Sequence, residues 1–215
     1  MTRGRAFKAG VWAVALAVAA WLAPSSPVHA LDLWMAARWT AVGRTVPALN
    51  LVWIVGAVPV AFTLAVGLGY FRRGLWALGA LVVGSAVEVA LKHGVTTPFP
   101  QTVAPPPPWP IWIRALNPSP NALVHRLAPW IGAAGTVAHP RILHGSFPSG
   151  HVFRLDLLAA AVWPRWAKSP YLEGWTVLTG LAVVATGGHW AWDVVGAYCL
   201  VRLLLTLRPT PPASG

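Results

Sequence analysis

The chain has 215 residues, of which 56% are hydrophobic and only 10% are charged. Soluble domains are about 25% charged, so this composition excludes an ordinary soluble protein and indicates an integral membrane protein. The formal net charge is +11, and the Lys and Arg residues cluster at the ends of apolar stretches, where control of membrane topology explains them. We therefore do not expect a nucleic-acid-binding protein.

Six apolar stretches predict an all-α integral membrane bundle of about six transmembrane helices, in one domain covering residues 1–215. The stretches cover residues 11–23, 49–70, 75–91, 152–166, 175–187 and 194–207. Several of them are shorter than the roughly 20 residues of an ideal span, so flanking residues must contribute to crossing the bilayer.

The beginning of the chain, residues 1–30, has two interpretations. A basic start, an apolar segment and the small-residue sequence Val-His-Ala at 28–30 are also typical of a cleaved signal peptide. We favour a first transmembrane helix, and cleavage would leave five spans. Residues 31–47 then alternate apolar and polar groups at near-helical spacing, which predicts an interfacial helix lying on the outer surface.

The distribution of basic residues predicts the orientation. With both termini in the cytoplasm, every short segment on that side carries Lys or Arg, as the positive-inside rule requires. These residues are Arg3, Arg5, Lys8, Arg72, Arg73, Arg165, Lys168 and Arg208. The proline-rich loop 93–147 and the turn containing His189 then lie outside. Within this loop, residues 105–108 predict a polyproline segment and residues 121–131 a short helix.

Residues 147–151, Phe-Pro-Ser-Gly-His, precede the fourth apolar stretch. Ser149 is a favoured helix N-cap, and the N-terminus of a helix is a ready anion site. Gly150 would let a phosphate approach the backbone, and His151 could donate a proton to a leaving oxygen. Arg154 shares the face of His151, and its guanidinium matches phosphate geometry. An ordinary helix cap is the alternative interpretation of this motif.

Two further pairs of polar residues lie at the outer ends of apolar stretches. His189 and Asp193 are neighbours if they lie one helical turn apart, so Asp193 can fix the imidazole tautomer and leave the other nitrogen free to attack. Lys92 follows Glu88 by four residues, so Glu88 can orient Lys92 toward phosphate oxygens. A structural His–Asp pair and a snorkelling lysine remain the alternatives.

Other polar groups carry weaker signals. Asp156 lies within the fourth apolar stretch and needs a partner that the sequence does not identify. Cys199 is alone in an apolar run, as is typical of a helix-packing residue. The remaining histidines show no metal-site spacing, and no nucleotide-binding motif is present.

These motifs resemble the phosphatidic acid phosphatase type 2 superfamily, which includes lipid phosphate phosphatases and bacterial undecaprenyl-diphosphate phosphatases. The family pattern is Lys, six residues, Arg-Pro; then Pro-Ser-Gly-His; then Ser-Arg, five residues, His, three residues, Asp. The matching residues are Lys92, Pro148, Ser149, Gly150, His151, His189 and Asp193. Phe99 and Val183 stand where the family has its two arginines.

The resemblance implies a phosphohydrolase at the outer face of a bacterial plasma membrane, acting on a lipid phosphate or diphosphate without metal or cofactor. It implies that His189 attacks phosphorus to form a phosphohistidine, that Asp193 orients His189, and that His151 protonates the leaving group. The groups implied to bind phosphate are Lys92, Ser149 and Gly150.

The two absent arginines leave a second hypothesis open. A phosphoryl transition state depends on such cations, so this chain could be a catalytically silent member that binds or moves phospholipid. Alternatively, another cation replaces them. Arg154 is our first candidate because it shares a face with His151, and Arg141 is the second.

Overall fold

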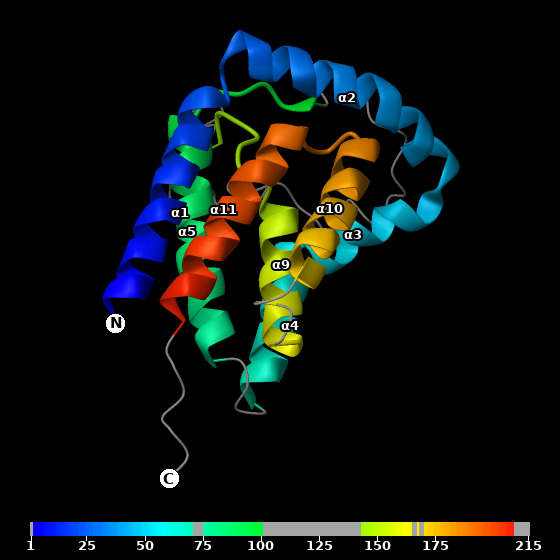
Figure 1. The fold of residues 1–215 in the computed structure, drawn as a ribbon. Helices are drawn as coiled ribbons and strands as arrows, with labels where there is room; N and C mark the ends of the chain where they lie inside the picture. The colour runs from blue at the N-terminus through cyan, green and yellow to red at the C-terminus, as the bar shows by residue number, and fades with distance from the viewer. Residues whose placement is uncertain (1, 71–74, 101–142, 165–166, 168–169, 209–215) are drawn as a thin grey trace, which may run out of the picture.

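The computed structural model describes residues 2–70, 75–100, 143–164, 167 and 170–208, and this part of the chain is helical throughout apart from its connections (Figure 1). The elements in chain order are α1 Arg3–Leu22, α2 Ser26–Thr45, the 3-10 turn η1 Pro47–Asn50, α3 Leu51–Val55, α4 Val58–Tyr70, α5 Leu75–Gly94, α9 Gly150–Val162, α10 Pro170–Ala185 and α11 Ala191–Leu207. The predicted all-α fold is confirmed.

Helix length alone does not give six spans within the described residues. α1 and α5 are long and apolar enough to cross a membrane, and the α3–α4 pair makes a third span if it is counted as one. That pair is bent by 66°, so the expected continuous stretch 49–70 is broken. Gly56 ends α3, and Pro59 lies in the first turn of α4, where its missing N–H is tolerated. The other helices, α9, α10 and α11, have 13, 16 and 17 residues.

Helix α2 lies across one end of the bundle, over the ends of α10 and α11 (Figure 1). Its helical conformation agrees with the prediction for residues 31–47, although it begins earlier, with Pro27 in its first turn. Leu31, Leu33 and Trp34 are exposed on α2, whereas Asp32 is buried against the bundle. These exposed apolar groups are compatible with the expected interfacial position.

Helix α9 forms the centre of the bundle. Every residue from Gly150 to Ala161 is buried, and α9 packs against α4, α5, α10 and α11. Because α9 is buried on all sides, its polar side chains must find partners inside the protein. Helix α1 packs along α11 at the edge of the bundle, where the rings of Trp12 and Tyr198 meet edge to face.

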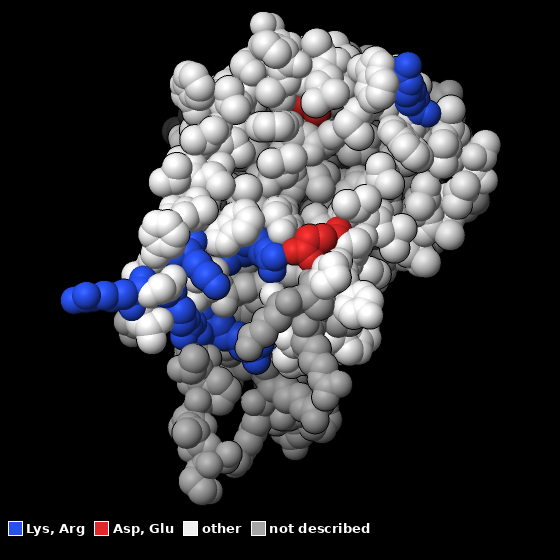
Figure 2. Space-filling view, viewed as in Figure 1, with Lys and Arg blue, Asp and Glu red and all other residues white. Residues whose placement is uncertain are grey.

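The two ends of the bundle differ in charge. The N-terminal end of α1 and the C-terminal end of α11 lie together, far from α2 (Figure 1). Lys and Arg gather at this end (Figure 2), where Arg5 donates a hydrogen bond to the Thr206 carbonyl and Arg202 pairs with Glu173. The outer ends of the first and last described helices therefore lie at the same end of the bundle, and their cytoplasmic location stays a prediction. The expected polyproline segment 105–108, the expected helix 121–131 and Arg141 lie outside the described residues.

Candidate functional site

The Pro-Ser-Gly-His motif forms the beginning of α9, as predicted. Ser149 is the N-cap, and its hydroxyl accepts a hydrogen bond from the backbone N–H of Val152 at 3.4 Å. The backbone N–H of Ser149 donates to the carbonyl of Asp193 at 2.9 Å. This second bond ties the start of α9 directly to the first turn of α11. Two motifs separated in the sequence are therefore fixed to one another through the backbone.

The predicted contact between His189 and Asp193 is present, although His189 precedes α11 and does not lie on the same helix as Asp193. Nδ1 of His189 lies 3.0 Å from Oδ2 of Asp193, which also accepts the backbone N–H of Trp190 at 3.0 Å. The other carboxylate oxygen accepts a hydrogen bond from the Ser146 hydroxyl at 3.2 Å. Because the carboxylate is a hydrogen-bond acceptor, it favours the tautomer with the proton on Nδ1. The Nε2 lone pair of His189 is then available for attack.

His189 belongs to the loop between α10 and α11, outside the helices. Burial lowers the pKa of its imidazole below the usual 6.5, while the hydrogen bond and charge of Asp193 act in the opposite direction. The lowered pKa favours the neutral form of His189. A neutral imidazole is the form that can act as a nucleophile.

The second imidazole lies beside the first. The ring centroids of His151 and His189 are 5.9 Å apart, so the two motifs meet at one end of the bundle as predicted. His151 is 7% exposed, and its Nε2 atom has no hydrogen-bond partner among the described residues. Buried polar atoms are normally satisfied by protein, water or ligand, so this nitrogen is free to bond with a group that enters the site.

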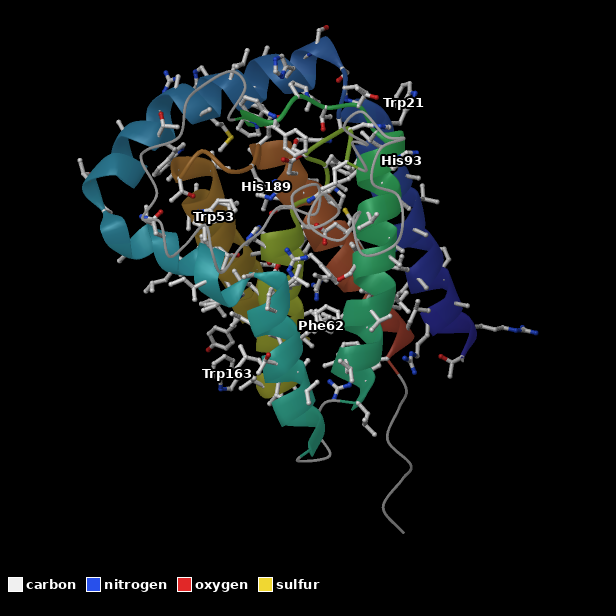
Figure 3. The ribbon with its side chains drawn as sticks, turned by 180° about the vertical axis from the view of Figure 1, so that it is seen from behind. Trp21, Trp53, Phe62, His93, Trp163 and His189 are labelled. Carbon is white, nitrogen blue, oxygen red and sulfur yellow. The ribbon has the colours of Figure 1, made fainter. Side chains whose placement is uncertain are left out.

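Trp53 of α3 contacts both imidazoles, which the sequence analysis did not predict. Its ring meets the His151 ring edge to face at 4.3 Å and stacks on the His189 ring at 6.1 Å. Its Nε1 donates a hydrogen bond to the Thr186 hydroxyl at 2.8 Å. Figure 3 shows Trp53 and His189 at the same end of the bundle, well separated from Phe62 and Trp163. Trp53 therefore packs against both histidine rings.

Glycines allow this close packing of the loop against Trp53. A Cβ atom on Gly188 would overlap the indole ring of Trp53. The preceding Gly187 has a φ of 72°, in the left-handed region that favours glycine. The two glycines let the chain turn sharply after α10 and place His189 under the indole.

The cationic side of the site consists of Lys92, Arg154 and Glu88. Oε1 of Glu88 accepts a hydrogen bond from Nζ of Lys92, and Oε2 accepts one from Nη1 of Arg154, each at 2.8 Å. Nε of Arg154 also donates to the carbonyl of Gly56 at 2.6 Å. The three charged side chains are at most 9% exposed. The predicted Glu88–Lys92 pair is thus present, and Arg154 joins it from α9.

Gly150 is required by this cluster. A Cβ atom at position 150 would overlap the carboxylate of Glu88, so the carboxylate lies directly against the first residue of α9. The motif by itself predicts that a phosphate makes this close approach. In the structure, the group that lies against Gly150 is the carboxylate of Glu88.

Asp32 of α2 is a further buried acidic group, next to the first turn of α11, that was not predicted from the sequence. Its Oδ1 accepts a hydrogen bond from the backbone N–H of Trp192 at 3.0 Å, one residue before Asp193. Burial raises the pKa of Asp32 from 3.8 to about 7, and the nearby negative charge of Asp193 acts in the same direction. Asp32 therefore connects α2 to the start of α11.

The remaining polar residues do not join the site. The partner of Asp156 is Thr176, whose hydroxyl donates to Oδ2 at 2.6 Å between α9 and α10. His93 and His144 pack against each other on the surface, with ring centroids 4.6 Å apart. Cys199 is buried, as expected. The described residues contain no cluster of three or more metal-ligating side chains.

Comparisons with known proteins identify the family and the fold. The model of the PAP2 superfamily matches residues 73–210, which include every predicted site residue. A similar solved structure is the crystal structure of the first transmembrane PAP2 type phosphatidylglycerolphosphate phosphatase from Bacillus subtilis. The two chains are 17% identical with a TM-score of 0.57, and the match covers 94% of each. At this identity the likeness establishes the fold. No curated protein sequence matches the chain.

Proposed function

The chain belongs to the PAP2 superfamily, and we propose that it is a membrane phosphohydrolase that removes phosphate from a lipid phosphate or diphosphate. The observation that carries this proposal is the convergence of His189, oriented by Asp193, with His151 at 5.9 Å between the ring centroids. A nucleophile with an oriented tautomer beside a second titratable group is the arrangement that covalent phosphoryl transfer needs.

In the proposed reaction, Nε2 of His189 attacks phosphorus and the bond from phosphorus to the lipid oxygen breaks. Protonated His151 donates its proton to that oxygen, so the lipid leaves as an alcohol, or as a monophosphate when the substrate is a diphosphate. Asp193 stabilises the positive charge that develops on His189. The products of this step are a phosphohistidine and either the lipid alcohol or, from a diphosphate, the lipid monophosphate.

The second half of the reaction hydrolyses the phosphohistidine. His151, now neutral, accepts a proton from a water molecule as the water oxygen attacks phosphorus. The phosphorus–nitrogen bond breaks, inorganic phosphate leaves, and His189 returns to its neutral form. Lys92 and Arg154 stabilise the charge on the phosphoryl oxygens, with Ser149 and Gly150 at the helix N-terminus.

Arg154 is proposed to replace one of the two family arginines. Val183 and Phe99 occupy the family positions, whereas Arg154 approaches Glu88 and Lys92 from the buried face of α9. Its hydrogen bond to the Gly56 carbonyl holds the guanidinium in place. The proposed substitute is therefore a cation from α9 that shares Glu88 with Lys92, the lysine of the family pattern.

A catalytically silent, phospholipid-binding protein is the second candidate. The observation that favours it is that both Lys92 and Arg154 are bound to Glu88, which reduces the positive charge available to a phosphate. The intact pair of His189 and Asp193 favours the enzyme, because binding alone does not require an oriented nucleophile.

The deciding experiment is phosphate release by the purified protein from a panel of lipid phosphates and diphosphates, with a chelator present. We expect the wild type to release phosphate and His189→Ala to release none. His93→Ala is the matched control, since His93 is an exposed histidine outside the site, and it should retain full activity. Binding of these lipids by the wild type without any turnover would instead support the silent protein.

A further inference from the structure

Glu88 lies among three groups that could bind a phosphate, namely Lys92, Arg154 and the backbone at Gly150. Its two carboxylate oxygens are each 2.8 Å from a cationic nitrogen, one on Lys92 and one on Arg154. The carboxylate also lies against Gly150, the first residue of α9, where only a glycine leaves room for it. Two cations and a glycine at a helix N-terminus are the elements of a phosphate site.

We propose that Glu88 is an internal anion that occupies the phosphate-binding position, and that substrate phosphate must displace it. This inference rests on the proposed function, and it makes Glu88 a specificity-determining residue. A phosphate attached to a lipid gains additional binding energy from its acyl chains and can displace the carboxylate. Free inorganic phosphate lacks those contacts, so Glu88 selects against the soluble product.

The balance of charges supports this role. The described charged groups around the histidines are Lys92 and Arg154, which are positive, and Glu88 and Asp193, which are negative. Their charges cancel, although a site for a phosphate dianion is expected to be positive. Asp193 is engaged by His189, Trp190 and Ser146, so Glu88 is the negative group that lies on the cations. Removing its charge would leave both cations to the ligand.

The buried Nε2 atom of His151 is an independent observation. It has no partner among the described residues. Arg154, which binds Glu88 together with Lys92, follows His151 by three residues on α9, so the two side chains share one face of the helix. An oxygen-rich ligand placed on these cations would therefore also lie near His151. Glu88 satisfies the two cations but leaves this nitrogen unpaired, as expected of a substitute that lacks the other oxygens of a phosphate group.

A purely structural role for Glu88 predicts the opposite result. If Glu88 only holds Lys92 and Arg154 in position, its loss disorders both cations and weakens phosphate binding. If Glu88 competes with phosphate, its loss strengthens phosphate binding. The sign of the change therefore separates the two roles without any measurement of turnover.

The experiment measures binding of inorganic phosphate by calorimetry to the wild type, Glu88→Gln and Glu88→Ala in detergent. We expect the dissociation constant to fall by at least about tenfold in both variants, because a like charge within a few ångströms of the ligand is removed at low effective dielectric. Glu173→Gln is the matched control, because Glu173 pairs with Arg202 at the opposite end of the bundle, and it should bind like the wild type.

Stability provides a second measurement. Removing Glu88 leaves two buried cations unpaired, which destabilises the folded protein. Phosphate should restore the missing anion, so millimolar phosphate should raise the melting temperature of Glu88→Ala more than that of the wild type. This readout also covers a variant that is too unstable for calorimetry.

The outcomes distinguish this inference from the proposed function. Weaker or unchanged phosphate binding in both Glu88 variants overturns the competing role of Glu88, and so does the absence of phosphate binding in every protein. Tighter binding together with no release of phosphate from any lipid supports the inference while rejecting the hydrolase. If the wild type releases phosphate from a lipid but the Glu88 variants bind phosphate more weakly, the hydrolase is supported and the competing role of Glu88 is rejected.

Discussion

Asp193 illustrates how one side chain can fix the chemistry of another. Its carboxylate accepts hydrogen bonds from the Trp190 backbone and the Ser146 hydroxyl in addition to its contact with His189, and it is only 1% exposed. The carboxylate therefore has little freedom to rotate. His189 is held in one orientation and one tautomer, which a less constrained carboxylate would not ensure.

Asp193→Asn should lower the rate of phosphate release by about 10³–10⁴-fold while leaving the fold intact. The amide has nearly the same shape as the carboxylate, but it can present a donor to His189 and reverse the tautomer. The measurement is kcat for phosphate release beside the melting temperature. A variant with near-normal kcat would show that Asp193 does not orient the nucleophile.

Arg154→Ala should lower kcat/KM by about 10²–10³-fold, since it removes one preorganised cation from the transition state. Arg38→Ala is the control, because Arg38 is exposed on α2 and stacks on Trp34. The same phosphate-release assay serves for both variants. Equal and small effects of the two substitutions would contradict the proposal that Arg154 replaces a family arginine.

The short elements around the histidines contribute more to the geometry of the site than the long spans do. Helix α3 has only five residues, yet it brings Trp53 to both imidazoles. The loop after α10 brings His189 beneath the same indole, and it can do so only because its glycines permit the close approach. The bent α3–α4 pair and the tight loop after α10 thus position Trp53 and His189, while α9 positions His151.

Gly188→Ala should destabilise the protein by about 1–3 kcal/mol and reduce activity, because the new methyl group overlaps Trp53 and must push the indole or His189 aside. Gly174→Ala in α10 is the matched control. A Cβ there meets no atom within 4 Å, and alanine is favoured over glycine within a helix by up to about 1 kcal/mol. Chemical denaturation of both variants checks the contrast. Similar stability changes in the two would mean that Trp53 can move freely.

The bundle as a whole places its polar site at one end and its basic surface at the other. Helix α2 covers the end of the bundle where His189 lies (Figures 1 and 3). Asp32 attaches α2 to the Trp192 backbone, and the indole of Trp192 donates a hydrogen bond to the Ala19 carbonyl of α1. The cover, the first helix and the start of α11 are therefore connected at the site.

Asp32 should make the stability of the protein depend on pH. Its pKa is 3.8 without burial and about 7 in the folded protein. The contribution of Asp32 is therefore full below pH 4 and is lost as the pH rises toward 7, because the unfolded chain ionises first. The melting temperature of Asp32→Asn should lack this decrease between pH 4 and 7. Parallel profiles of the wild type and the variant would exclude Asp32 as the cause.

The sequence by itself determined the class of fold and the chemical groups of the site. Apolar stretches and the scarcity of charge predicted a helical membrane protein, and local motifs predicted the N-cap at Ser149 and the pairs His189–Asp193 and Glu88–Lys92. All of these depend on neighbours within about one helical turn, so local geometry is sufficient to predict them. The positions of the basic residues also predicted that both motifs share one end of the bundle.

Only the tertiary structure decided which distant residues meet. Trp53 carried no signal beyond being an aromatic residue in an apolar stretch, and Ser146 was notable only for preceding the motif at 147–151. Asp32 was one of 5 acidic residues in the chain, a rarity that could have drawn attention to it. The break between α3 and α4 and the approach of Arg154 to Glu88 both depend on packing between helices. Hydrophobic patterns specify that a face is buried, but the partner of that face is chosen by the fit of side chains across the whole bundle.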